Sequence, residues 1–155
     1  MEPLAITVRW ASSSEELRGA VAVRERVFCC EQGVPREEEL DGRDGEAQHV
    51  VALEPGGGRV IATLRLLEDG RRAKVGRVAV ERDWRRRGIA ARMLELALEQ
   101  ARADGCTEAR LAAQLQVTGL YEQAGFVVGS DQFDDAGIPH VWMALQLDAH
   151  ERMGG

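Results

Sequence analysis

The fold is decided by the stretch Val78-Ala79-Val80-Glu81-Arg82-Asp83-Trp84-Arg85-Arg86-Arg87-Gly88-Ile89-Ala90-Ala91, which runs from an apolar strand through a basic turn into a helix. The first N–H groups of a helix lack partners within the helix and carry a partial positive charge, which favours a bound anion. Three consecutive arginines add positive charge there, and small residues let a phosphate approach the main chain. The stretch predicts a diphosphate-binding turn; the alternative is a solvated arginine-rich loop.

Other phosphate-binding motifs are absent from the sequence. No G-x-G-x-x-G follows a predicted strand, and no G-x-x-x-x-G-K-[ST] occurs. Both absences argue against a dinucleotide-binding fold and against a P-loop ATPase.

Length and composition indicate one globular domain, which we expect over residues 1–150 with a short tail at 151–155. The 155 residues are 45% apolar and 30% charged, enough for a core without disulfides. Cys29, Cys30 and Cys106 have no metal-binding spacing, so packed, reduced thiols are expected. No apolar run has membrane-spanning length and no signal peptide begins the chain, so we expect the cytoplasm.

Charge is distributed unevenly along the chain. The net charge of −6 makes general nucleic-acid binding unfavourable. Basic residues gather at Arg71, Arg72, Arg77, Arg82, Arg85, Arg86 and Arg87, and acidic ones at Glu37, Glu38, Glu39, Asp41, Asp44 and Glu46. The first group suits an anionic ligand and the second a cationic one, although most single charges in such runs are solvated surface.

Hydrophobic periodicity and turn residues predict the order β-α-β-β-β-α-β-α-β-β. A capping box at Ser12–Glu16 starts a helix that reaches about Val27. The predicted strands are 4–10, 50–53, 60–66, 73–80, 108–113, 126–128 and 141–147, and the later helices begin at 89 and cover 116–123. The segment 35–46 is a loop that can hold a short helix, and 133–140 is a shaped turn. The simplest fold is α+β, one mixed sheet flanked by helices.

Motifs from about Val21 to Met143 together resemble the GCN5-related N-acetyltransferase superfamily. Arg85-Arg86-Arg87-Gly88-Ile89-Ala90 is similar to its acyl-CoA pyrophosphate loop, and Tyr121-Glu122-Gln123-Ala124-Gly125-Phe126 to its later motif. Six further segments resemble motifs of its ElaA-like branch: Arg24–Phe28, Glu31–Pro35, Glu39–Asp41, Gln48-His49, Ala113-Gln114 and Ala136–His140. The resemblance implies a mostly antiparallel mixed sheet whose fourth and fifth strands splay apart around the thioester.

The resemblance also implies the site residues. The acetyl-CoA contacts fall on Val78, Ala79, Val80, Arg85, Arg86, Arg87, Gly88, Ile89, Ala90, Ala91 and Gln114. Gln114 departs from the asparagine of many members, which moves the amide outward by one methylene. Tyr121 is the only tyrosine and falls where the superfamily protonates the departing CoA thiolate. A phenol is protonated at neutral pH and suits that task.

The amine acceptor must lose a proton before or during attack, so a base is needed. Candidates are Glu31, Glu38, Asp41, His49 and His140, of which Glu31 and His140 join Tyr121 as expected catalytic residues, and His49 is more typical of a structural histidine. The three histidines share no helix spacing, so no metal site is expected. The implied activity is direct acetyl transfer to an unidentified amine in a ternary complex. A non-catalytic acyl-CoA-binding module and a protein-interaction domain are the alternatives, and dimers are common in the superfamily.

Overall fold

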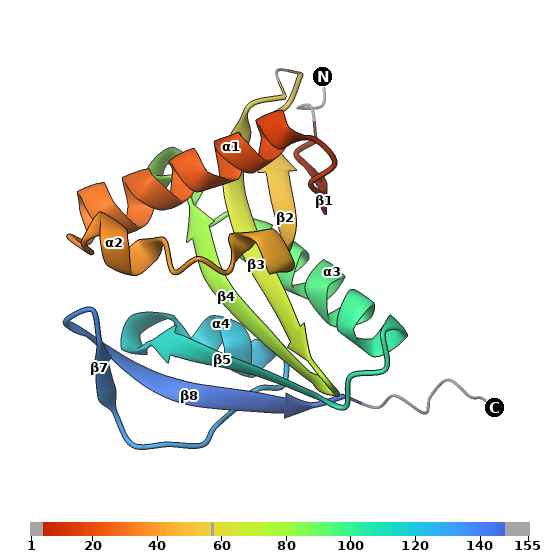
Figure 1. Ribbon diagram of the computed structural model, residues 1–155, viewed down its shortest axis with the longest axis vertical. Helices are drawn as coiled ribbons and strands as arrows, with labels where there is room; N and C mark the ends of the chain where they lie inside the picture. Colours follow the sequence, from red (N-terminus) through yellow and green to blue (C-terminus); the bar gives the residue numbers. More distant parts are fainter. Residues whose placement is uncertain (1–4, 57, 148–155) are drawn as a thin grey trace.

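The computed structural model describes residues 5–56 and 58–147, so the predicted tail at 151–155 lies outside the described residues (Figure 1). Its strands are β1 (Thr7–Trp10), β2 (Gln48–Leu53), β3 (Val60–Asp69), β4 (Arg72–Val80), β5 (Glu108–Gln114), β6 (Val127–Val128), β7 (Phe133–Asp135) and β8 (Ile138–Gln146). These eight form one sheet in the order β1-β2-β3-β4-β5-β8-β6, with β7 paired to β8. Only β4 and β5 run parallel, which confirms the predicted mixed, mostly antiparallel α+β fold.

Helices cover both faces of the sheet (Figure 1). They are α1 (Ser14–Arg24), α2 (Arg36–Glu39), α3 (Ile89–Ala103) and α4 (Thr118–Gln123), and a π-helix, Glu25–Glu31, extends α1. The apolar stripe of α3, centred on Met93 and Ala97, packs with Val50 and Ala52 of β2 in the larger core. Val51, which lies between these two residues and points to the other face, packs with α1 in the smaller core. Because successive side chains of β2 point to opposite faces of the sheet, this one strand contributes to both cores.

The start of α1 follows the predicted capping box closely. Ser13 Oγ accepts a hydrogen bond from the Glu16 N–H at 3.1 Å, and the Glu16 carboxylate accepts one from the Ser12 N–H at 2.9 Å. The end of the helix differs from the prediction, because the chain continues as a π-helix to Glu31 instead of ending near Val27. π-Helical turns concentrate at functional sites, and this one carries Glu31 toward the basic turn.

The segment 133–140, predicted as a turn, is instead a β-hairpin. Strand β7 pairs with the start of β8, and Ala136 and Gly137 form the connection. Both residues have positive φ, 54° and 79°, as a two-residue hairpin turn with right-handed strand twist requires. Because alanine rarely takes that conformation, the predicted turn could not be narrowed to Ala136 and Gly137, and the short strand before it was missed.

Strands β4 and β5 pair only over Arg72–Lys74 and then diverge. Just past that point β4 has a bulge, in which Arg77 and Val78 together lie opposite Leu64 of β3. Arg77 has φ 51°, a left-handed conformation that costs about 1–2 kcal/mol in a non-glycine residue. A bulge bends its strand and increases its twist, so β4 changes direction again beyond the point where it leaves β5. From Val75 onward the β5 side of β4 has no partner strand in the described residues.

Candidate functional site

The basic turn connects the open end of β4 to the start of α3. Gly88 is the N-cap of α3 with φ 77° and ψ 11°, and a Cβ placed on it would meet no atom within 4 Å. Arg86 has φ 65°, so two of three successive residues are left-handed. Strain of this kind persists at ligand-binding loops whose surroundings impose it. Glycine is the residue that adopts this cap without strain and leaves its backbone exposed to a ligand.

The arginines of the turn have different partners. Arg85 donates from Nε to the Val80 carbonyl at 2.8 Å and forms an ion pair with Glu31 at 2.5 Å. Arg87 stacks on the Trp84 ring at 4.7 Å and donates to the Asp83 carbonyl. In the part of the chain that the structure describes, Arg86 forms no ion pair. One guanidinium is thus free, and another lies on the carbonyl at the end of β4.

Glu31 lies against the turn. Arg82 and Arg85 bind its carboxylate at 2.9 and 2.5 Å, and these hydrogen bonds and charges lower the pKa of Glu31. A carboxylate held by two guanidinium groups is a weak proton acceptor. This placement favours a role in holding the arginines over the base role expected from the sequence. Sequence spacing carried no signal for these pairs, because Glu31 and Arg85 lie 54 residues apart.

Gln114 and His140 lie opposite each other where β5 and β8 pair, beside the gap between β4 and β5. Gln114 donates to Gln32 Oε1 at 3.0 Å and accepts from Gln116 Nε2 at 2.8 Å, so both ends of its amide have protein partners. The bond to Gln32 links the end of β5 to the segment after the π-helix.

His140 is 8% exposed and stacks on Phe133 at 6.0 Å. Its Nδ1 lies 2.7 Å from the Ile138 carbonyl oxygen. A carbonyl only accepts, so Nδ1 carries the proton and Nε2 of the neutral ring presents a lone pair. No other described residue hydrogen bonds to this ring. In this tautomer Nε2 can accept a proton.

Tyr121 lies on α4 and packs edge to face against Phe126, with 6.1 Å between ring centroids. The residue is 6% exposed, and burial raises the pKa of Tyr121 to about 12. Among the hydrogen bonds of the described residues, none involves its hydroxyl. The phenol therefore keeps its proton through the physiological range and has no competing partner for it.

The acidic segment 37–46 is largely neutralised by arginines. Arg24, fully buried, binds Glu39 at 2.6 Å and Asp44 at 2.8 Å. Arg65 binds both Asp41 and Asp44, and Arg77 of the bulge binds Glu39 and Asp41. Arg43 also binds Glu46, so four of these six acids are paired with arginines and are not free to meet a cationic ligand. The same contacts give the strained bulge residue Arg77 its anchor.

Three candidate bases belong to this segment or contact it. The Arg65 guanidinium, which donates twice, holds the pKa of Asp41 far below its usual range. His49 Nε2 bonds to the Asp44 carbonyl oxygen at 3.1 Å and the ring is 7% exposed. Asp41 is thus unsuited to accept a proton, and His49 has the hydrogen bond of a structural histidine. Glu38 is exposed, and in the described residues its carboxylate forms no hydrogen bond, whereas its main-chain carbonyl accepts from Arg77.

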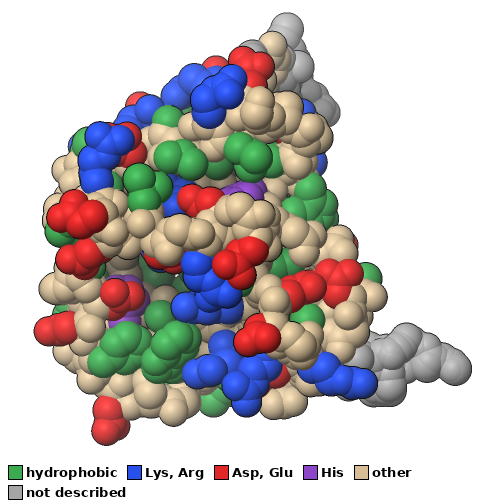
Figure 2. Space-filling view, viewed as in Figure 1, with side chains coloured by type: hydrophobic (Ala, Val, Ile, Leu, Met, Phe, Trp, Pro, Cys, Tyr) green, Lys and Arg blue, Asp and Glu red, His purple; other side chains and the backbone are tan. Residues whose placement is uncertain are grey.

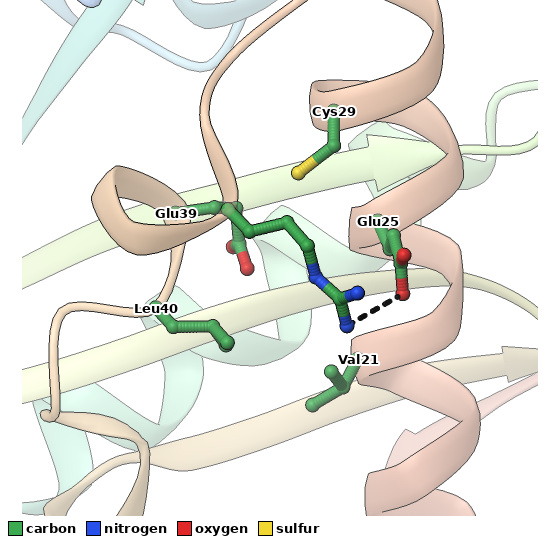
Figure 3. A pocket seen from close by; sticks show the side chains of 6 residues that line it. Val21, Glu25, Cys29, Glu39 and Leu40 are labelled. Carbon is green, nitrogen blue, oxygen red and sulfur yellow. Dashed lines mark hydrogen bonds and ion pairs between the residues drawn. The ribbon is translucent and has the colours of Figure 1, made fainter.

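A small pocket lies between α1, the π-helix and α2 (Figure 3). It is lined by Val21, Glu25, Cys29, Arg36, Glu39 and Leu40. Arg36 binds Glu25 across it at 3.4 Å, and the free space fits about one water molecule. Burial, together with nearby Glu39 and Glu25, raises the pKa of the Cys29 thiol, which keeps it protonated and unreactive.

Comparison with known proteins gives a consistent result. A family model described as "Acetyltransferase (GNAT) domain" matches residues 12–147. The uncharacterized N-acetyltransferase YjcF of Bacillus subtilis is 38% identical over 135 residues, 86% of this chain and 94% of that protein. An acyl-CoA N-acyltransferase from Pseudomonas aeruginosa superposes with a TM-score of 0.78 at 30% identity, covering 92% of this chain and 99% of the other. Escherichia coli ElaA superposes with the same score at 23% identity and the same coverage.

The chain belongs to the GNAT acetyltransferase family and is an acyltransferase. The resemblance drawn from its motifs is confirmed, including the likeness in fold to ElaA. Within the described residues, no helix is long and apolar enough to cross a membrane, and no group of three or more His, Cys, Asp or Glu side chains is arranged to hold a metal ion.

Proposed function

We propose that this chain is an acetyl-CoA-dependent N-acetyltransferase that moves the acetyl group directly to an amine acceptor. One observation carries the proposal: the unpaired edge of β4 past Lys74 leads directly to the open, basic N-terminus of α3. An extended amide chain adds to a free strand edge through main-chain hydrogen bonds. A diphosphate suits exposed helix N–H groups flanked by arginines.

Acetyl-CoA fits the groups present at both ends of this path. Residues 85–91 would hold the diphosphate, with Arg86 free to contact it and the Gly88 backbone open to it. Val78, Ala79 and Val80 would face the pantetheine arm through their main chain, provided that Arg85 leaves the Val80 carbonyl. Gln114 would contact the arm by exchanging one of its two amide partners. When bound, acetyl-CoA supplies an acetyl group activated as a thioester.

Two side chains are proposed to move protons. His140 Nε2 takes the proton that the amine nitrogen loses as it bonds to the acetyl carbon. Tyr121 gives its hydroxyl proton to the sulfur as the carbon–sulfur bond breaks, leaving acetylated amine and free CoA. The phenol and imidazole then exchange protons with solvent. Glu31 holds Arg82 and Arg85 at the turn and takes no part in proton transfer.

The test has two stages. Calorimetry with acetyl-CoA measures binding, and a thiol reagent then detects CoA released in the presence of an amine panel. Saturable binding and amine-dependent CoA release support the proposal. Binding without CoA release for any amine supports a non-catalytic acyl-CoA-binding module instead, and absence of binding contradicts both.

A further inference from the structure

An aromatic surface lies beside the gap between β4 and β5, on a part of the sheet that no helix crosses in Figure 1. Phe133 of β7 stacks on Trp142 of β8 with 5.8 Å between centroids, and on His140 at 6.0 Å. Hydrophobic side chains gather over β7 and β8 in Figure 2, with Lys and Arg side chains beside them. Both Phe133 and Trp142 are half-buried, so part of each ring is available to a ligand.

Two cations border this surface. Lys74 Nζ lies 5.5 Å and the Arg110 guanidinium 4.8 Å from the centre of the Trp142 ring. Lys74 and Arg110 are the last register pair before β4 and β5 diverge, so both lie where the gap begins.

The charges of these two side chains are not neutralised. In the described ranges neither forms an ion pair, whereas their neighbours Arg72 and Arg77 do. Partial burial, and then the positive charges of Arg65, Arg77 and Arg43, lower the pKa of Lys74. A field that opposes one more positive charge favours an anion.

We propose that Lys74, Arg110, Phe133 and Trp142 bind the acceptor, and that the acceptor is an α-amino acid with a large apolar side chain. The inference rests on the proposed acetyl transfer. The carboxylate binds between Lys74 and Arg110, and the apolar side chain covers the exposed part of the Trp142 and Phe133 rings. The amine then points along β8 toward His140.

The spacing agrees with an acceptor of this size. His140 and Trp142 are two residues apart on one face of β8, which places their Cα atoms about 7 Å apart. Both cations lie within 5.5 Å of the Trp142 ring centre, so an acceptor held there by its carboxylate lies one same-face residue away from His140. A polyamine or other polycation is disfavoured, because Lys74 and Arg110 repel additional positive charge.

The experiment compares amines that differ only in the carboxylate: phenylalanine with phenethylamine, and leucine with isoamylamine. We measure kcat/KM for CoA release at saturating acetyl-CoA. The amino acid of at least one pair should exceed its partner by about tenfold or more, the range of a lost charged hydrogen bond. Arg110→Gln should remove that preference by raising the KM for the amino acid.

Controls separate this inference from the proposed function. Arg102→Gln, an exposed arginine on α3, removes the same charge elsewhere and should keep the preference. Both variants should keep the melting temperature and the acetyl-CoA Kd. Equal or better turnover of the carboxylate-free amine in both pairs overturns the inference while acetyl transfer stands. No turnover of any of the four, with acetyl-CoA still bound, also overturns it. Absence of acetyl-CoA binding overturns both.

Discussion

Replacing Tyr121 by phenylalanine removes one oxygen atom from the proposed proton donor and little else. The Phe126 edge-to-face contact is retained, and the hydroxyl has no hydrogen-bond partner among the described residues to leave unsatisfied. The free energy of unfolding should therefore change by less than about 1 kcal/mol. Loss of a general acid lowers the rate by about 10²- to 10⁴-fold, or roughly 3–5 kcal/mol in activation free energy. A large kinetic loss with an unchanged fold is the expected signature.

The assay measures CoA release at saturating acetyl-CoA and amine, with thermal melting and calorimetric acetyl-CoA binding as controls. The pKa of about 12 implies that Tyr121 keeps its proton as pH rises through 10. The wild-type rate should then show no alkaline loss from this group below about pH 11. A Tyr121→Phe enzyme with wild-type kcat, or one that loses activity only by unfolding, would refute the assignment.

The other predictions concern Glu31, Arg24 and Glu68. Glu31→Gln removes the carboxylate that neutralises Arg82 and Arg85, so both guanidinium groups become available to the diphosphate and calorimetry should find acetyl-CoA bound about threefold more tightly, the size of one exposed ion pair; weaker binding would contradict this. Arg24→Met takes one of two arginine partners from buried Glu39 and from half-buried Asp44, which keep Arg77 and Arg65, and denaturant unfolding should show a loss of about 3 kcal/mol, against a change below about 1 if the pairs are dispensable. Burial and the Asp104 carboxyl raise the pKa of Glu68 to about 7, so the protonated form stabilises the fold below pH 4.5 and the benefit is lost as pH rises through 7. Glu68→Gln should therefore stabilise the fold by about 1 kcal/mol at pH 8, seen as a higher melting temperature, and change the melting temperature little at pH 5. Equal shifts at both pH values would count against a raised pKa for Glu68.

Local patterns in the sequence predicted most of the elements. The period of α3, the Ser13 cap of α1 and the meander β2–β4 all follow from signals within a few residues of one another. The β7–β8 hairpin was missed because its turn places Ala136 in a conformation that alanine seldom adopts. The position of the basic turn at a helix start was predicted equally well, since strand, glycine and helix are contiguous there.

The surroundings of the site depended on contacts between distant segments. The pairs Arg24–Asp44, Arg65–Asp41 and Arg85–Glu31 join residues 20, 24 and 54 positions apart, and no periodicity signals such pairs. Lys74, Arg110 and Trp142 meet only because β4, β5 and β8 are adjacent in the sheet. Strand order is a tertiary property, and it is what brings these cations to one aromatic ring.

The central claim is tested most directly by the calorimetric titration of acetyl-CoA into the wild-type chain and into two glycine variants. Gly88→Glu and Gly105→Glu add the same side chain at opposite ends of α3, and both glycines have positive φ and open space around them. Saturable binding should appear in the wild type and in Gly105→Glu and vanish in Gly88→Glu, whose carboxylate occupies the turn. Equal binding by both variants, or no uptake by folded wild-type protein at millimolar acetyl-CoA, would contradict the account.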